Sequence, residues 1–467
     1  MRILRCRGDR GKFVNALLRC AAAVFFCAAP GVFAGTPGYE VKTGSETVND
    51  QVYTTSDNDT SGVYVHNDST FTVYDSTITN SGSSSSLQNS AYYGFNAVAL
   101  VESSATLVMR GGKLASTGNG ATGAFASTGG RIYLNNVAFN SIALSASALG
   151  VSLGGFISAV GVNAVTYGGA AHLLSGANGG GSIIVSGGSY TANGHGAAGI
   201  YALGSVAAYG TSITANDGEA AIVYGNSSVV IQDSSLAGAA GSGDQGLLLY
   251  SDDDVPSGTA RLTMSGGTLG WPSTTGPVIR AANQSAVVSL STVTMNDSST
   301  VLARAEAVGG WGLAGTNSAA LVINASSQAL AGALYSDAIS TITLNLYNAS
   351  SFSGLASTAS IYADATSTIT ITGSSFMDAL VSSSALVFQA PSGPVPDGAS
   401  YSTVTVRSLG LDGLLQVNAY LSGDATQADR LVVNGGPVTG SALVRLNVTG
   451  HTGAATTGNG IKLVDLT

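Results

Sequence analysis

Residues 182–194 read SIIVSGGSYTANG, and residues 206–218 read VAAYGTSITANDG. In each segment an alternating run of strand length is followed by a turn, a second short run and an Asn/Gly ending. Further copies of this theme occupy residues 70–82, 105–118 and 131–140, or begin near Val229, Arg261, Val287, Leu321, Ile342 and Ile369. The chain is therefore predicted to be one elongated repeat array rather than two or three separate globular domains.

The spacing of the copies predicts the fold. Taking Ser182, Val206 and Val229 as markers gives steps of 24 and 23 residues, and wider gaps elsewhere indicate inserted loops or a missed copy. Three short strands per step, without a helical period, predict an all-β protein, a right-handed single-stranded parallel β-helix. We expect roughly 16–19 coils, each coil being one turn of the β-helix, in a rod of about 75–90 Å. Leucine-rich repeats and propellers are disfavoured because their consensus residues are absent.

The C-terminal stretch, residues 401–467, has the most regular β pattern of the chain. Its strand-length runs are residues 403–406, 414–417, 430–433, 443–448 and 461–464. Turn sequences at 434–436 and 458–460 separate some of these runs. Residues 390–398 hold three of the nine prolines, which predicts a loop or boundary in front of this stretch. The predicted division is therefore a rod at 35–398 and a C-terminal β cap at 399–467, because a stack of strands must cover its open edge.

This C-terminal stretch also resembles a known family, the pertactin-like autotransporter passengers of type V secretion, in the part called the autochaperone region. The residues that carry the resemblance are Asp429, Leu431, Val433, Gly435, Gly440, Gly458, Gly460, Ile461, Leu463 and Val464. The resemblance implies a surface-exposed or secreted, adhesin-like and virulence-associated β-helix without catalytic activity. It also implies an outer-membrane translocator barrel as partner. No barrel follows in this chain, so we expect it to be missing or separately encoded.

The resemblance leaves several expectations about folding and partners. The C-terminal region is expected to nucleate the stacking of coils, since each coil gains stability only by stacking on one already formed. Host-cell surface or matrix proteins, or glycans, are the expected ligands of a monomeric passenger. A truncated remnant with no independent function remains an alternative. The sequence does not indicate which receptor would be bound.

Residues 1–34 have the pattern of a signal peptide. Six basic residues precede or flank a short apolar run at 21–29, and Ala34 and Gly35 are the predicted cleavage site. The three cysteines, Cys6, Cys20 and Cys27, all lie in this segment, so the mature chain would have no disulfide. This pattern predicts that the chain is exported. The resemblance to autotransporter passengers further implies a route through the periplasm to the outer membrane, the cell surface or the medium of a Gram-negative bacterium.

The charge balance argues against one class of partner. Without residues 1–34 the chain has 11 basic and 25 acidic residues, a net charge of −14. Such an acidic chain is unsuited to binding the phosphate backbone of nucleic acids. Hydrophobic residues at 45% argue against disorder.

No residue pattern predicts catalysis, a cofactor or a metal. Residues 150–154 match G-x-S-x-G, but outside a strand-to-helix turn the match is expected by chance. The four histidines are far apart and are interpreted as surface or loop residues: His66, His172, His195 and His451. The acidic groups at 252–254 and 57–59 are interpreted as solvated turns rather than calcium loops.

The alternative function is that of a polysaccharide-active enzyme, since some β-helices cleave glycans. Such a site needs clustered carboxylates, or carboxylates with Arg or Lys, and residues 35–398 are poor in these types. The pair Asp217 and Glu219 is estimated to lie about one coil from Asp233 and could share a face with it. The 18 tyrosines would suit a binding surface if exposed, or would otherwise stack within the coils.

Overall fold

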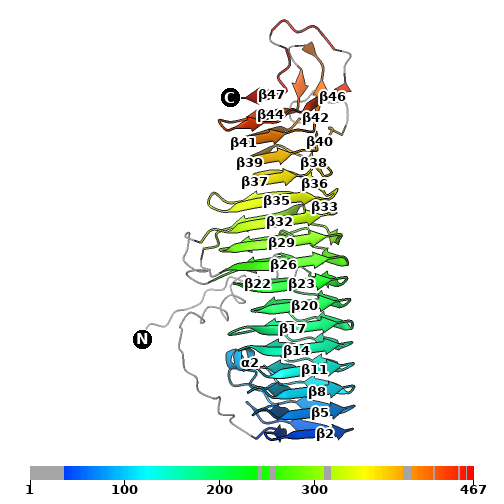
Figure 1. Ribbon diagram of the computed structural model, residues 1–467, viewed down its shortest axis with the longest axis vertical. Coiled ribbons are helices and arrows are strands. Elements are labelled where there is room, and N and C mark those ends of the chain that lie inside the picture. The colour runs from blue at the N-terminus through cyan, green and yellow to red at the C-terminus, as the bar shows by residue number, and fades with distance from the viewer. Residues whose placement is uncertain are drawn as a thin grey trace, which may run out of the picture.

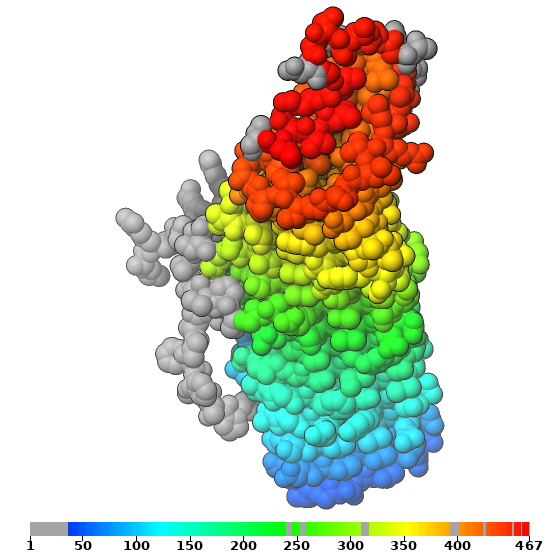
Figure 2. Space-filling view, turned by 45° about the horizontal axis from the view of Figure 1, so that its top comes forward, coloured from blue at the N-terminus to red at the C-terminus, as the bar shows by residue number. Residues whose placement is uncertain are grey.

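The computed structural model describes residues 36–239, 245–252, 258–309, 317–392, 401–423, 426–450, 453–458 and 460–466. These residues form a rod of stacked parallel strands, with the first described coil at one end and the last strands at the other (Figure 1). In the space-filling view the sequence colours follow one another along the rod from blue to red, because each coil is a layer (Figure 2). The predicted all-β parallel β-helix is confirmed.

Over most of the rod each coil contributes three strands, one to each of three columns. The first column consists of β1 (Tyr39–Val41), β4 (Val63–Val65), β7 (Ala99–Val101), β10 (Ala124–Ala126), β13 (Leu149–Val151), β16 (Leu174–Gly176), β19 (Ile200–Ala202), β22 (Ala221–Tyr224), β25 (Leu247–Tyr250), β28 (Ile279–Ala282), β31 (Val301–Glu306) and β34 (Ala333–Ser336). The second, which we call the long-strand column, consists of β2 (Ser45–Asn49), β5 (Thr70–Tyr74), β8 (Thr106–Arg110), β11 (Arg131–Asn135), β14 (Gly155–Val160), β17 (Gly181–Ser186), β20 (Ser205–Tyr209), β23 (Ser228–Gln232), β26 (Thr259–Ser265), β29 (Ser285–Ser291), β32 (Ala320–Ser326) and β35 (Thr341–Tyr347). The third consists of β3 (Val52–Thr55), β6 (Thr77–Asn80), β9 (Lys113–Ser116), β12 (Ala138–Ser141), β15 (Asn163–Thr166), β18 (Ser189–Ala192), β21 (Ser212–Ala215), β24 (Ser235–Ala237), β27 (Thr268–Trp271), β30 (Thr294–Asp297), β33 (Ala329–Ala331) and β36 (Ser351–Gly354).

The pairing register explains both the regular and the irregular spacing of the repeats. Ile183 pairs with Val206, and Val206 pairs with Val229, so both steps are 23 residues rather than 24 and 23. The wide gap between the copies at 131 and 182 holds a missed coil, whose long strand is β14. The gap between Val229 and Arg261 is instead an insertion, because β23 pairs directly with β26. Both predicted explanations of wide gaps therefore occur.

The interior of the rod is built from ladders of aliphatic side chains. In the long-strand column every second side chain points inward, and paired strands place these residues directly on one another. One ladder contains Leu107, Ile132, Ile157 and Ile183, all fully buried. Each such side chain contributes about 1.5–3 kcal/mol by leaving water, so the stack of coils holds itself together without disulfides.

A short helix interrupts the β pattern between the second and third coils. The helix α2 (Leu87–Tyr93) starts at Ser86, whose hydroxyl accepts the Asn89 N–H, and ends at Gly94 in the left-handed region. Gly94 lies close against the Phe125 ring, where a Cβ would collide with it, so the helix is fastened to the side of the rod (Figure 1). The sequence analysis did not predict α2, because seven residues are too few to show a helical period.

Beyond β36 the coils change from three strands to two longer ones. The first and second columns merge in β37 (Ala356–Ala363), β39 (Ser375–Ser382) and β41 (Thr403–Leu411). At the merger β37 pairs with both β34 and β35, and Thr358 forms a bulge with a φ of 60°. The third column continues as β38 (Thr368–Ile371), β40 (Ala385–Phe388) and β42 (Leu414–Tyr420). The prediction of three strands per coil therefore holds only up to β36.

The last described strands complete the stack. They are β43 (Gln427–Ala428), β44 (Arg430–Val433), β45 (Val438–Thr439), β46 (Leu443–Gly450) and β47 (Val464–Leu466). The predicted strand at 461–464 is wrong, since only Val464 of that run belongs to a strand. In the described residues the long-strand column and its continuation form seventeen layers, from β2 to β47, with β44 and β45 in one layer, and this number lies within the predicted range of coils. Because β39 pairs with β41, stacking continues across the predicted boundary at 398, although residues 393–400 are outside the described ranges.

The third column has one break, between β30 and β33. There the buried Gln328 side chain bonds to the backbone just before β30, accepting from the Val293 N–H at 2.8 Å and donating to the Val293 carbonyl at 2.8 Å. The amide group thus supplies the two hydrogen bonds that a neighbouring backbone would have made.

Candidate functional site

The strongest sequence signal for function lies in the C-terminal coils, and Asp429 is its one buried charged residue. This carboxylate is buried immediately before β44. It accepts hydrogen bonds from the Ser402 N–H at 2.7 Å, the Asn418 N–H at 2.9 Å and the Asn418 side-chain amide at 2.6 Å. Burial raises the pKa of Asp429, while its three donors act in the opposite direction.

Asn418 extends this network to the neighbouring coils. Its side-chain nitrogen also donates to the carbonyl of Phe388 at 3.1 Å, at the end of β40. Its side-chain oxygen accepts from Asn447 of β46 at 2.6 Å. One buried acid–amide group therefore connects β40, β42, β44 and β46, which are adjacent layers of the rod. Such a network fixes the register of the layers, because a shifted strand would leave buried donors unpaired.

The other predicted motif residues have two kinds of position. Leu431 and Val433 are buried in the interior ladders of β44. Gly435 and Gly440 have φ values of 74° and 94°, and they form the turns after β44 and β45. The two apolar residues therefore anchor β44 in the core, and the two glycines allow the turns that follow β44 and β45.

The remaining motif residues lie nearer the surface. Gly458 and Gly460 have open space around their α-carbons, and Ile461 is exposed. Leu463 packs against the core, and Val464 pairs with Leu431 in β47. The structure therefore brings Leu463 and Val464 to the core strands and leaves the glycines at the edge.

The inward-facing side chains of the last strands are unusually exposed. Val444, Leu446 and Val448 continue the ladders of β42 but are 48%, 39% and 49% exposed. Val464 and Leu466 continue the ladders of β44 and are also exposed. The final described strands thus form the last layer of the stack, but their own core side chains face solvent.

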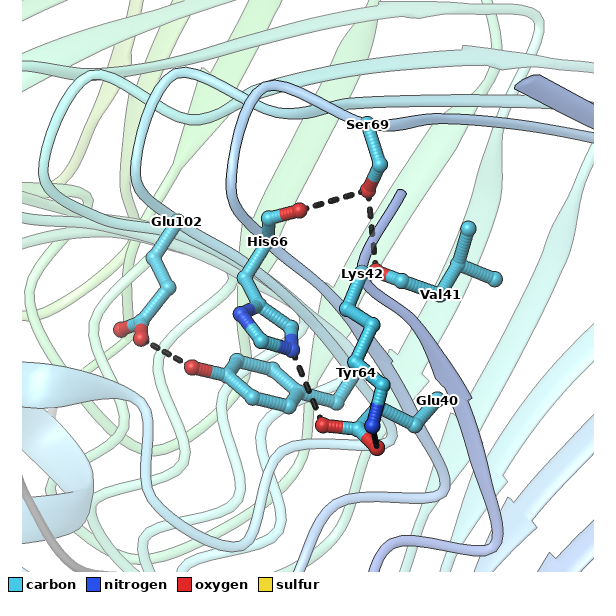
Figure 3. Close-up of polar contacts among 7 residues, drawn as sticks. All are labelled: Glu40, Val41, Lys42, Tyr64, His66, Ser69 and Glu102. Carbon is cyan, nitrogen blue, oxygen red and sulfur yellow. Dashed lines mark hydrogen bonds and ion pairs between the residues drawn. The ribbon is translucent and has the colours of Figure 1, made fainter. Parts of the chain in front are cut away.

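The first coils carry a polar and aromatic cluster on the outside of the first column (Figure 3). The Tyr64 hydroxyl donates to Glu102 one coil further on, and the His66 ring stacks on Tyr64 with centroids 4.2 Å apart. His66 Nε2 lies 2.9 Å from a Glu40 oxygen one coil back. Lys42 completes the cluster with a 3.3 Å contact to Glu40. The hydrogen bond with His66 is the main cause that lowers the pKa of Glu40. The cluster fastens the first three coils to one another.

The outward surface of the long-strand column carries exposed tyrosines, and we call this surface the tyrosine face. Two register columns contain them: Tyr74, Tyr209 and Tyr347 in one, and Tyr133 and Tyr362 in the other. All five are 36–44% exposed. The alternative that the tyrosines stack inside the coils holds for Tyr190, which is buried, but not for these five. The sequence alone did not separate the two groups.

A second polar group was missed by the sequence analysis because its members are far apart in the chain. On the outside of the first column, Arg280 Nε donates to Glu306 at 2.7 Å, and Arg280 Nη1 donates to the Gln245 oxygen at 3.0 Å. The Gln245 amide in turn donates to Glu219. Direct pairing of β22, β25 and β28, together with β31, brings these four residues to one face. No signal in the sequence fixes that register across the insertions.

The carboxylates considered for glycan cleavage do not form a pair. Asp217 and Glu219 precede β22, whereas Asp233 follows β23 at another corner of the same coil, so the estimate of one coil between them is wrong. Asp217 instead lies 3.3 Å from His195. The predicted shared face is therefore not formed.

The other motifs of the sequence have structural positions. Ser152 of the G-x-S-x-G match is buried, and its hydroxyl donates to Ser127 at 3.0 Å. Asp59 accepts from the Ser85 N–H at 2.7 Å and thereby holds the next turn. Asp253, Asp254 and His451 lie outside the described residues.

Of the described histidines, His66, His172 and His195 lie between strands, as predicted, but the His172 ring is packed rather than free at the surface. Its ring stacks on Tyr201 with centroids 4.9 Å apart, and its Nδ1 accepts from the Ala198 N–H at 3.0 Å. Burial lowers the pKa of His172 to about 4. Within the described ranges, no three His, Cys, Asp or Glu side chains come together as metal ligands would. No helix in the described part of the chain is long and apolar enough to cross a membrane.

Comparison with protein families adds an independent observation on the C-terminal coils. Residues 375–467 match the model of the autochaperone domain type 1. The match begins at β39 and includes Asp429, Asn418 and every predicted motif residue. No curated protein matches the chain. An autochaperone domain implies a secreted or surface-exposed protein of a Gram-negative bacterium. The match confirms the predicted resemblance to an autotransporter passenger that ends in an autochaperone region.

Proposed function

We propose that the protein is a surface-exposed or secreted, adhesin-like passenger that binds host molecules and catalyses no reaction. The observation that carries this proposal is the tyrosine face, a continuous parallel sheet surface with five exposed tyrosines. Tyrosine gives a large contact area and one polar end at a low cost in side-chain entropy, which suits recognition of proteins and glycans. A rigid rod presents such a surface without having to order it on binding.

The second part of the proposal concerns how the rod is assembled. The C-terminal coils fold first and serve as the template on which the remaining coils stack, one by one, toward the N-terminus. The partner for export is an outer-membrane translocator, in the same chain or separately encoded, and the folded passenger acts as a monomer. The buried Asp429–Asn418 network supports this part, since it fixes the register of the layers on which all others would be built.

Binding of the purified chain to host cells and matrix proteins tests the main proposal. A variant with serine in place of Tyr74, Tyr133, Tyr209, Tyr347 and Tyr362 should keep its fold and lose most of its binding. A matched variant would change exposed residues outside this face, such as Tyr167 and Ile339, and should bind normally. Equal binding by both variants would contradict the tyrosine face as the binding surface.

One observation favours a second candidate, a glycan-cleaving activity. The Glu219–Gln245–Arg280–Glu306 group places two carboxylates and a guanidinium on one face. A glycan-cleaving site needs such a cluster, and the low content of charged residues in the sequence argued against one. Incubation with polysaccharides and detection of reducing ends or unsaturated products tests it. Release of products by the unaltered chain, abolished by both Glu219→Gln and Glu306→Gln, would replace the binding proposal with an enzymatic one.

A further inference from the structure

The tyrosine face is hollowed where β8, β11 and β14 lie side by side. A depression of about 170 Å³ opens there between outward-pointing side chains. Six side chains line it: Val108, Arg110, Tyr133, Asn135, Ser158 and Val160. None of them is acidic.

The register of the three strands arranges these side chains as a grid. Tyr133 lies between Val108 and Ser158 in one column, and Asn135 lies between Arg110 and Val160 in the next. Neighbouring strands are about 4.8 Å apart, and alternate residues along a strand are about 6.7 Å apart. The grid is therefore the size of one or two pyranose rings, and the sheet keeps it rigid.

The aromatic wall of the hollow is held in place from one side. The Tyr133 ring contacts the Phe156 ring with centroids 5.8 Å apart. The Arg131 guanidinium lies over the Phe156 ring, 5.9 Å from its centroid, and so helps to hold the ring that supports Tyr133. Tyr133 is 39% exposed, so part of its ring remains available on the side of the hollow.

The polar groups of the hollow have no partners among the described residues. No described residue forms an ion pair or side-chain hydrogen bond with Arg110, Asn135 or Ser158. Without residues 1–34 the chain has a net charge of −14, so the unpaired Arg110 guanidinium is a local positive charge on an acidic protein. A guanidinium binds a carboxylate with two parallel hydrogen bonds, and amide and hydroxyl groups suit sugar hydroxyls.

We propose that this hollow is a binding site for an acidic saccharide, a glycan bearing a sugar carboxylate. The carboxylate pairs with Arg110, the hydroxyls bond to Asn135 and Ser158, and an apolar face of the ring lies on Tyr133 between Val108 and Val160. This inference rests on the proposed binding function and names its ligand class and its place on the tyrosine face. An acidic peptide would use Arg110 as well, but it has no ring to cover the aromatic wall.

The test measures binding of the full chain to three acidic saccharides by calorimetry and saturation-transfer NMR. The probes are galacturonate tetramers, glucuronate-containing oligosaccharides and sialyl oligosaccharides, each compared with its methyl ester. At least one acid should bind, with its ester about tenfold weaker or undetectable. Arg110→Ala and Tyr133→Ala should each weaken binding of the acid at least tenfold.

Matched controls lie outside the hollow. Tyr167 is an exposed tyrosine outside the tyrosine face, and Arg261 is an exposed arginine of the long-strand column at the register position of Arg131 rather than of Arg110. Tyr167→Ala and Arg261→Ala should leave binding unchanged.

Three results would overturn the site: no binding of any acidic saccharide, equal binding of acid and ester, or equal losses in the control variants. Binding of polyglutamate alone would also overturn it. If the saccharide site fails while the chain still binds host cells through its tyrosines, only the ligand class is wrong.

Discussion

The two ends of the rod close their ladders in different ways. At the N-terminal end, Tyr39 and Tyr53 pack on Phe71, and Glu46 takes the inward position directly below Phe71 in the register. The Tyr39 hydroxyl donates to Glu46, so one of the two inward positions of β2 is polar and hydrogen-bonded, while the other is Val48, which packs against the core. At the C-terminal end, the inward positions are the exposed Val444, Leu446 and others, while the polar network lies one layer deeper, around Asp429.

This difference indicates which end of the rod the remaining coils depend on for their stability. The N-terminal end is a finished surface, and its removal exposes one further coil that is similar to the others. The C-terminal end has its register-fixing group inside the stack and an apolar layer outside it. We therefore expect damage at the C-terminal end to spread along the rod and damage at the N-terminal end to remain local.

Deletion of the terminal strands at each end should show the largest contrast. Removal of residues 426–467 takes away β43 to β47 and the Asp429 carboxylate, whose Oδ2 accepts both hydrogen bonds from Asn418. Refolding from denaturant should become at least tenfold slower, with protease sensitivity along the rod. Removal of residues 36–55, which takes away β1 to β3, should leave refolding within about threefold of normal. Refolding kinetics by circular dichroism, with limited proteolysis, would measure both, and equal effects would contradict the contrast.

Substitutions in the ladders should differ according to depth. Ile361→Ala removes a fully buried side chain between Leu344 and Leu380 and should cost about 3 kcal/mol in unfolding free energy. Leu446→Ala, in the exposed C-terminal layer, should cost less than about 1 kcal/mol. Chemical denaturation measures both. A cost at Leu446 as large as at Ile361 would show that its exposed side is covered in solution.

The Asp429 network should be worth more than a surface ion pair. Asp429→Ala leaves the Ser402 N–H and both Asn418 donors without their acceptor, at a cost of about 2–3 kcal/mol. Asp465→Ala breaks only an exposed 3.0 Å contact with Lys462 and should cost under about 0.5 kcal/mol. Hydrogen exchange of β41 and β42 amides reports the local loss, and equal losses in the two variants would refute the role of the network.

Acid should act with opposite sign at the two ends, and this is the smallest expected effect. The pKa of Glu40 is lowered, mainly by its hydrogen bond with His66, so its contribution is present above its unfolded pKa and is lost as pH falls. The pKa of Asp429 is raised by burial, so its contribution is largest at low pH and declines as pH rises through the folded value.

Hydrogen exchange corrected for its intrinsic pH dependence can compare the two ends at pH 7 and pH 4. The amides of β1 and β4 should lose protection at pH 4, by under about 1 kcal/mol because Glu40 is partly exposed. Those of β42 and β44 should lose none through Asp429. Glu40→Gln should remove the acid sensitivity of the first coils, and an unchanged sensitivity would assign it to another group.

The sequence predicted those features that depend on local alternation. The strands of Ile132 and Ile183 were predicted because apolar and polar residues alternate around them. The strand β14 was missed because its inward residues include the small Ala159, which weakens the alternation. The C-terminal motif was recognised because Asp429 and its glycines lie close together in the chain.

Features that depend on long-range register could not be predicted. The Arg280 group forms only because insertions leave β22, β25 and β28 in direct contact, and insertion lengths carry no register information. The hollow around Tyr133 depends likewise on which outward residues of three coils become neighbours. The exchange of three strands for two after β36 depends on a bulge at Thr358, for which the sequence has no turn residue.

The most direct test of the central claim is pulsed hydrogen exchange during refolding of the purified chain, read by mass spectrometry of its peptides. The account predicts that β41, β42, β44 and β46 gain protection first and that protection then advances coil by coil to β2. Earlier protection of β2 to β8, or simultaneous protection of the whole rod, would contradict a C-terminal origin of folding.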